Sequence, residues 1–172
     1  MSSSEHESQK DTRIAEIRRT AILGIDYGKV RIGLALADIE TALPRPLATI
    51  ERVNRNEDMR RLREVTREHA VKEIVVGLPL RLDGTRGDMA EEAARFGQRL
   101  HKQLGLTVEM VDERLTSWEA ERLLEEQQGR TIHAASGKKR KKENERMGVD
   151  AMAAALILKE YLDRQQTVQD AK

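Results

Sequence analysis

The sequence predicts a single α/β domain built around a mixed, five-stranded sheet flanked by helices. Its 172 residues fit one domain, and a hydrophobic content of 38% is enough for a compact core. Short apolar runs of strand length come first, and segments with helical periodicity then alternate with further strands. The expected order is βββαβαβαα without an internal repeat, which favours an α/β fold over an all-α or all-β fold.

Three closely spaced strands open the domain. The run Ala21-Ile22-Leu23-Gly24-Ile25-Asp26 reads as a strand buried on both faces, and a turn at Gly28-Lys29 follows it. Further strands are expected at residues 31–37 and 47–51. The short connections predict an antiparallel meander, with Pro44 and Pro46 between the second and third strands, where their missing N–H groups do little harm.

The remaining elements alternate. Apolar residues at helical spacing predict helices over residues 56–70 and around Met89 to Leu100, with strands at 73–77 and 107–111. Thr116 and Glu119 have the spacing of a capping box, which predicts a helix over residues 117–127. The last helix is expected at residues 149–162. These elements place the domain at residues 20–164, after an extension at 1–19 and before a tail at 165–172.

A polar segment at residues 129–147 is expected to be a flexible basic loop, because loops of this length in compact domains are commonly functional or disordered. Between Gly129 and Gly148 there are seven basic and two acidic residues, whereas the rest of the chain has 24 basic and 28 acidic residues. The net charge of +1 therefore hides one concentrated positive field. Such a field favours a local contact with a polyanion, although a run like Lys138 to Lys142 is also common in solvated stretches.

Several classes of function are disfavoured by the composition. There is no cysteine, which excludes disulfides and thiolate chemistry, and the four histidines show no metal-ligand spacing. No apolar segment is long enough to suggest a membrane span, and the first residues lack the pattern of a secretory signal. We therefore expect a cytoplasmic protein. With only four aromatic residues, contacts to the backbone of a structured nucleic acid are favoured over stacking of successive unpaired bases.

Three carboxylates lie in apolar surroundings. Asp26 ends the first strand, Glu113 and its neighbour Asp112 end the strand at 107–111, and Asp150 interrupts the apolar start of the last helix. Buried acids are costly unless they are paired or bind a cation. Each has a simpler interpretation as a turn residue or as an acid near a helix N-terminus. Strand alternation sends Asp112 and Glu113 to opposite faces, and the sequence alone does not decide which faces a shared site.

Four ordered motifs carry a resemblance to a known family. They are Gly24-Ile25-Asp26-Tyr27-Gly28 with Arg31 to Ala35, Val75 to Pro79 with Asp83-Gly84 and Phe96, Asp112 to Ser117, and Val149-Asp150 with Ala153-Ala154. From about Thr20 to Asp163 the chain resembles the YqgF/RuvX family, whose members have an RNase H-like fold and are described as pre-16S rRNA nucleases or Holliday junction resolvase homologues. The terminal segments fall outside this resemblance.

The resemblance implies a metal-dependent nuclease. Its catalytic and metal-binding acids would be Asp26, Glu113 and Asp150, with Asp112 as a reserve candidate, and the metal would be Mg²⁺ or Mn²⁺. The expected partner is nucleic acid, either structured RNA such as the 5′ end of pre-16S rRNA or branched DNA. The residues expected to contact it are Arg31, Arg114, Lys138, Lys139, Arg140, Lys141 and Lys142.

Other functions stay open at this point. The same domain could cleave Holliday junctions, for which a homodimer would suit a two-fold substrate. It could also bind nucleic acid without cleaving it. An ATP-binding protein of the actin or sugar-kinase type is disfavoured, since such proteins need two lobes and this chain has the length for one.

Overall fold

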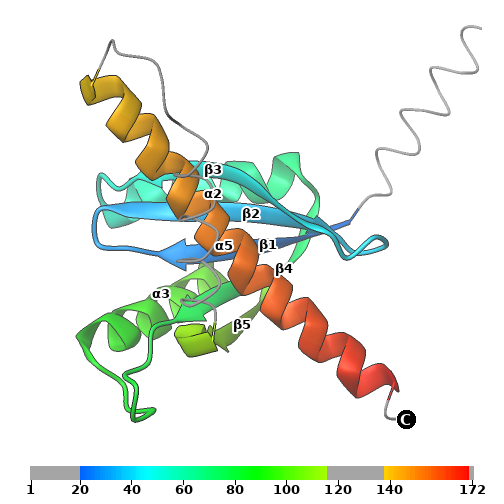
Figure 1. Cartoon of the computed structure of the whole chain (residues 1–172). Helices are drawn as coiled ribbons and strands as arrows, with labels where there is room; N and C mark the ends of the chain where they lie inside the picture. The colour runs from blue at the N-terminus through cyan, green and yellow to red at the C-terminus, as the bar shows by residue number, and fades with distance from the viewer. Residues whose placement is uncertain (1–19, 116–137, 171–172) are drawn as a thin grey trace, which may run out of the picture.

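A five-stranded mixed sheet forms the centre of the protein in a computed structural model, which describes residues 20–115 and 138–170 (Figure 1). The strand order is β3-β2-β1-β4-β5. Strands β1, β2 and β3 form the expected antiparallel meander, and β1, β4 and β5 run parallel. The mixed sheet is therefore confirmed. The strands are β1 (Ala21–Tyr27), β2 (Arg31–Asp38), β3 (Pro44–Glu51), β4 (Val71–Leu78) and β5 (Thr107–Asp112).

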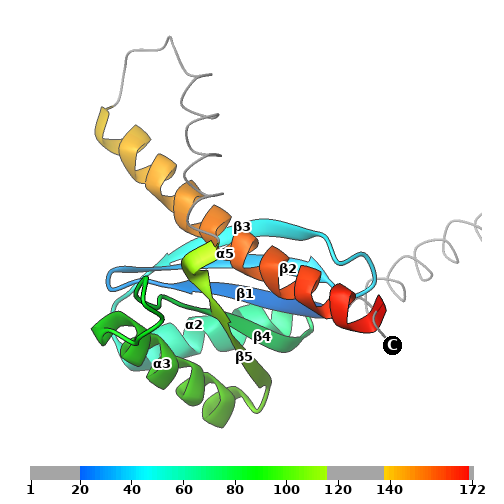
Figure 2. The ribbon, with the colours of Figure 1, turned by 60° about the horizontal axis from the view of Figure 1, so that its bottom comes forward.

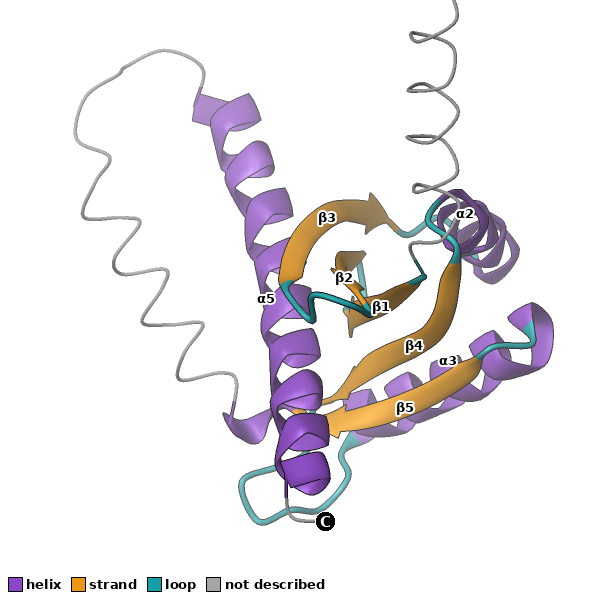
Figure 3. Cartoon of the chain, turned by 90° about the vertical axis from the view of Figure 1, so that its right-hand side faces the viewer, coloured by secondary structure: helices purple, strands orange, loops and turns teal. Residues whose placement is uncertain are grey.

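Helices cover both faces of this sheet. Helices α2 (Arg55–Glu68) and α3 (Asp88–Leu104) pack on one face, and α5 (Lys138–Asp170) crosses the other (Figures 2 and 3). Asn54 begins α2 by accepting hydrogen bonds from the backbone N–H groups of the first turn. Gly105 ends α3 in the left-handed conformation, with φ of 69°, which glycine adopts without steric cost.

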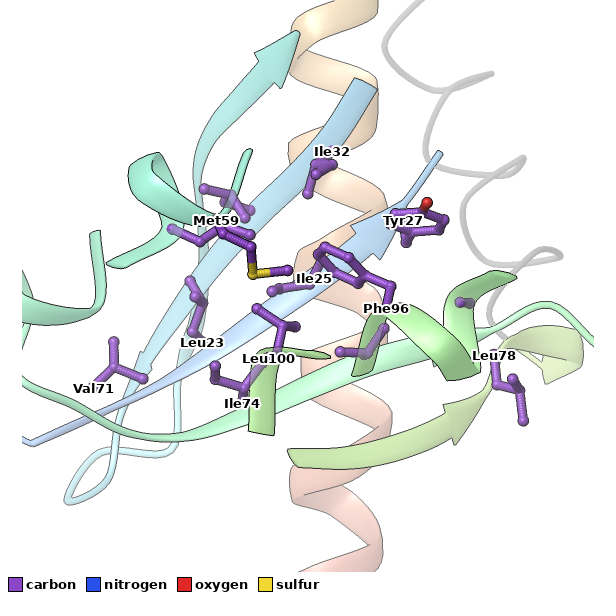
Figure 4. Close-up of a cluster of buried hydrophobic side chains, with 14 of the residues drawn as sticks. Leu23, Ile25, Tyr27, Ile32, Met59, Val71, Ile74, Leu78, Phe96 and Leu100 are labelled. Carbon is purple, nitrogen blue, oxygen red and sulfur yellow. The ribbon is translucent and has the colours of Figure 1, made fainter. Parts of the chain in front are cut away.

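The face under α2 and α3 is filled by large side chains. Alternate residues of β1, namely Leu23, Ile25 and Tyr27, point into this cluster, as Figure 4 shows. Phe96 of α3 stacks on Tyr27 with ring centroids 4.4 Å apart, and Leu100 lies fully buried beside them. Burial of each such side chain contributes about 1.5–3 kcal/mol to folding.

The face under α5 also holds large apolar residues, among them Ile22, Val75 and Leu158, but small residues line the places where α5 crosses β1 and β2. A β-carbon added at Gly24 of β1 would lie 2.8 Å from the backbone oxygen of Ala154, and one added at Gly33 of β2 would overlap the backbone oxygen of Asp150. Alanines at positions 35 and 37 of β2 are also buried here. Because these positions have little or no side chain, the backbone of α5 lies directly against the sheet.

Two expectations about the elements are wrong. Pro44 and Pro46 lie inside β3 rather than before it; β3 is an edge strand, and a register irregularity between Leu34 and Ala35 accompanies them. An edge strand tolerates proline because its outer N–H groups need no partner within the sheet.

The last helix is longer than expected in both directions. It begins at Lys138 rather than at residue 149, so residues 138–147 of the expected flexible loop have a helical backbone, and it continues to Asp170 through most of the expected tail. Lys, Arg, Glu and Met are good helix formers, and the run before Gly148 contains neither glycine nor proline. The concentration of positive charge at residues 138–147 therefore does not indicate a loop there.

Some expectations fall outside the described residues: the extension at 1–19, the capping box of Thr116 and Glu119 with its helix, and loop residues 129–137. Within the described ranges, no helix is both long enough and apolar enough to cross a membrane.

Candidate active site

Asp26 occupies the end of the central strand β1. It shares a strand face with Gly24, so its side chain points toward α5 rather than into the large core. The carboxylate is largely buried, and this burial, together with the negative charge of Asp150, raises its pKa to about 6. A raised carboxyl pKa means that the site holds negative charge at a cost, as expected where a cation binds.

Glu113 lies beside Asp26. It directly follows β5 and begins the short 3₁₀ helix η1 (Glu113–Leu115). A β-carbon added at Gly77 of β4 would overlap the Glu113 carboxylate, so glycine makes room for it above the sheet. Burial raises the pKa of Glu113 to about 7, with further contributions from the charges of Asp26 and Asp112.

Asp112 is held differently. Its carboxylate accepts a bidentate interaction from the Arg114 guanidinium, with Arg114 Nη2 2.6 Å and Nε 2.9 Å from Asp112 Oδ2 and Nε 3.0 Å from Oδ1. The hydrogen bonds from Arg114 lower the pKa of Asp112. Val111 packs in the cluster under α5, so alternation directs Asp112 to the other face and the following Glu113 toward the site.

Asp150 approaches from α5. It lies about three turns inside the helix, so the interpretation as an acid near a helix N-terminus does not apply. Its Oδ2 accepts a hydrogen bond from Arg31 Nε at 2.6 Å, and the Asp150 and Arg31 side chains are 23% and 30% exposed. Arg31 shares the α5-facing side of β2 with Gly33, whose missing side chain lets Asp150 come close.

The three acids form an electrostatically coupled group, but they do not converge on one point. Asp26 is influenced by Asp150, and Glu113 by Asp26. Within residues 20–115 and 138–170, no set of three or more His, Cys, Asp or Glu side chains is placed to hold a metal ion. Carboxylate oxygens are ligands that Mg²⁺ and Mn²⁺ prefer. The donor chemistry of Asp26 and Glu113 therefore fits a divalent cation, while Asp150 is engaged by Arg31.

Sequence reasoning missed a buried ion pair that holds the turn after Asp26. Arg52 Nε donates to Asp58 Oδ2 at 3.1 Å, and Asp58 is only 2% exposed. Arg52 Nη1 also donates to the carbonyl oxygens of Gly28 and Lys29, and its guanidinium lies 4.6 Å from the centroid of the Tyr27 ring. An acid in the first turn of a helix, such as Asp58, is explained by its favourable interaction with the helix dipole. No signal in the sequence therefore pointed to its ion pair with Arg52.

The residues predicted to contact nucleic acid lie on β2, η1 and α5. Arg114 is exposed beside the acids, and the backbone of Lys138, Lys139, Arg140, Lys141 and Lys142 forms the first turns of α5. The N-terminal part of α5 projects past the sheet in Figure 1. The basic run thus lies on the same helix as Asp150, about two to three turns before it.

Comparisons with known proteins bear on the fold first. A solved structure of T. thermophilus RuvC in complex with a Holliday junction substrate matches 85% of this chain and 96% of its own, with a TM-score of 0.52 and 16% identity. At that identity the likeness shows the fold alone. The mixed sheet with helices on both faces is therefore an RNase H-like fold.

The family follows from the sequence comparisons. Residues 20–164 match the RuvX family, described as Holliday junction resolvase. A relative from Anaeromyxobacter dehalogenans strain 2CP-C is 44% identical over 83% of this chain and 96% of its own length, and one from Caldanaerobacter subterraneus subsp. tengcongensis is 35% identical over 84% and 96%. Both carry the provisional name pre-16S rRNA nuclease. The chain belongs to the RuvX family.

Proposed function

We propose that this protein hydrolyses phosphodiester bonds of structured nucleic acid with the help of a divalent cation, and that its physiological reaction is processing of the 5′ end of pre-16S rRNA in the cytoplasm. The observation that carries this proposal is the pair of Asp26 and Glu113, two partly buried carboxylates with raised pKa values. They lie at the same end of the parallel strands β1 and β5, on either side of β4. The names of the relatives support the choice of rRNA as substrate.

Each site residue has a defined part in this proposal. Asp26 and Glu113 would hold Mg²⁺ or Mn²⁺, and Asp150 would join them when Arg31 releases it. A bound cation of this kind lowers the pKa of an attacking water and stabilises charge on the phosphodiester. Arg31, once released, and Arg114 would pair with phosphate oxygens, and Lys138 to Lys142 would contact phosphates farther along the strand.

The test is a cleavage assay with an RNA that spans the 5′ boundary of 16S rRNA. Wild-type protein with Mn²⁺ should cut this RNA, and Asp26→Asn should reduce the rate by at least about 10²-fold, because the cation that Asp26 would help to hold supplies several kcal/mol of transition-state stabilisation. Nucleic-acid binding should survive, because the basic residues are unchanged. Undiminished cleavage by purified Asp26→Asn protein would contradict the assignment of the site.

Cleavage of Holliday junctions is the second candidate, because the description of the matching family favours it. A four-way junction presents two symmetric phosphates, so this reaction would call for a homodimer. Incubating the same protein with a synthetic junction, and measuring its mass by light scattering with and without the junction, separates the two. Faster cutting of the junction than of the RNA, by a dimer, would favour the resolvase.

A further inference from the structure

The connection between β4 and α3 is a loop that is held in shape by internal hydrogen bonds. Two backbone hydrogen bonds join its two sides. The N–H of Arg81 donates to the carbonyl oxygen of Thr85 at 2.9 Å, and the N–H of Gly84 donates to the carbonyl oxygen of Arg81 at 2.8 Å. Asp83 Oδ1 accepts from both the backbone N–H and the hydroxyl of Thr85, at 2.9 and 2.6 Å. An isolated β-bridge joins the two sides of the loop at Leu80 and Arg86. The loop therefore has a defined shape.

This shape projects one apolar side chain into solvent. Leu82 is 96% exposed, the highest value for a large hydrophobic residue among the described residues, while Leu80 at the base packs against the core. Single exposed leucines are common on protein surfaces and need no special explanation. Leu82 differs because the loop that carries it is hydrogen-bonded on both sides and stands next to the acids.

The loop lies at the rim of the candidate active site. A β-carbon added at Gly84, whose φ is +83°, would lie 3.3 Å from Arg114 Nη1, so the loop rests against the residue that follows Glu113. Strands β1 and β4 are parallel and adjacent, which puts the end of β4 at the same edge of the sheet as Asp26.

Two exposed arginines flank Leu82 in the loop, which favours a partner that carries phosphates. Arg81 and Arg86 are both exposed in the loop, and Arg114 is exposed behind it. The acid between them, Asp83, is exposed as well; it accepts two hydrogen bonds from Thr85, and these lower its pKa. An apolar tip between guanidinium groups suits a nucleobase flanked by phosphates, because apolar side chains of this kind pack against base steps in nucleic-acid complexes.

We propose that Leu82 packs against the exposed face of the base pair where a duplex opens into single strand, with Arg81 and Arg86 on the neighbouring phosphates. This inference rests on the proposed function and deepens it: the loop would place the boundary of a structured nucleic acid at a fixed distance from Asp26 and Glu113. The site would then select its phosphate by the position of the boundary rather than by base sequence.

The test measures the stacking of the base at the boundary between duplex and single strand. An RNA hairpin with a single-stranded extension carries 2-aminopurine at the last paired position, and binding is followed by fluorescence in the Asp26→Asn background so that the RNA stays intact. Binding should raise the fluorescence, because Leu82 would displace the first unpaired base, which otherwise stacks on the 2-aminopurine and quenches it. Leu82→Ser should remove most of this rise and weaken binding about five- to tenfold, because an aliphatic side chain offers a base less contact than the aromatic rings that stack on bases.

Leu43→Ser is the matched control. Leu43 is also a highly exposed leucine, at 71%, but it precedes β3 at the opposite end of the sheet from Asp26. This variant should leave fluorescence and affinity unchanged. An unaltered fluorescence rise with Leu82→Ser, or an equal loss with Leu43→Ser, would overturn the proposal.

Cleavage separates this inference from the proposed function. With Asp26 restored, Leu82→Ser should cut a fully single-stranded RNA at the wild-type rate and should cut the hairpin at scattered positions. Absence of cleavage of any RNA by wild-type protein would defeat the proposed function and leave the fluorescence test intact. Wild-type cleavage with an unchanged cut position in Leu82→Ser would defeat the role of the loop alone.

Discussion

The two faces of the sheet differ in how closely the helices approach the strands. Under α2 and α3, large side chains such as Leu23, Phe96 and Leu100 fill the space between helix and strands. Under α5 large side chains are buried too, but at Gly24 and Gly33 helix backbone meets strand backbone directly. The first face stabilises the fold through buried volume. The second sets the distance between α5 and β1, and with it the distance between Asp150 and Asp26.

The glycines of the two faces show the same contrast. At Gly97 of α3 the nearest atom to an added β-carbon is Met110 Sδ at 2.9 Å, the end of a flexible side chain that can move. At Gly33 the added atom would overlap the backbone oxygen of Asp150. One face can adapt to a larger residue, and the other can do so only by moving α5.

The largest effect on stability is expected from Leu100→Ala on the α2 and α3 face. Leu100 is fully buried, so the change should lower the free energy of unfolding by about 2–5 kcal/mol. The rate of RNA cleavage per folded molecule, measured below the melting temperature, should stay near that of wild type. If fully folded Leu100→Ala protein lost as much cleavage as Asp26→Asn, the α2 and α3 face would affect the reaction as strongly as the α5 face, which would contradict this account.

Gly33→Ala should have a smaller effect on stability and a larger effect on the reaction. Overpacking typically costs about 1–3 kcal/mol, and a displacement of about 1 Å near reacting groups can reduce the rate by about 10²-fold. Denaturant titration and cleavage kinetics measure the two effects. Gly97→Ala is the control and should change both far less. Equal behaviour of the two variants would remove the distinction between the faces.

The pH dependence of stability should come largely from the α5 face. Asp26 and Glu113 have pKa values of about 6 and 7 in the folded protein, above their ordinary values of 3.8 and 4.5. The folded state therefore binds more protons than the unfolded state between about pH 4 and pH 7, and stability should fall as pH rises through this window. Thermal melts of wild type and Asp26→Asn across this range check the effect, and the variant should show a shallower decline. A decline of equal steepness in both proteins would place its origin elsewhere.

Much of the fold could be predicted because it depends on local pattern. The apolar run ending at Asp26 and the helical periodicity around Phe96 predict their elements without reference to the rest of the chain. The start of α5 at Lys138 was not predicted, since a run of like charges resembles a solvated loop even when its residues are good helix formers.

The arrangement of the site depends on contacts that the sequence does not show. Asp150 and Arg31 are 119 residues apart, and only the packing of α5 on β2 reveals that they meet. The choice between Asp112 and Glu113 needed the face of β5, which becomes visible only when Val111 is seen under α5. Three acids were expected to share one site. Asp26 is coupled by charge to both Asp150 and Glu113, and Asp150 also accepts a hydrogen bond from Arg31.

Binding of Mn²⁺, measured by calorimetry at pH 8, tests the central claim that Asp26 and Glu113 form the cation site. Wild-type protein should bind Mn²⁺, Asp26→Asn and Glu113→Gln should each weaken binding by at least about tenfold, and Asp112→Asn should bind like wild type because Asp112 is occupied by Arg114. Loss of binding in Asp112→Asn with retention in Glu113→Gln would contradict the account.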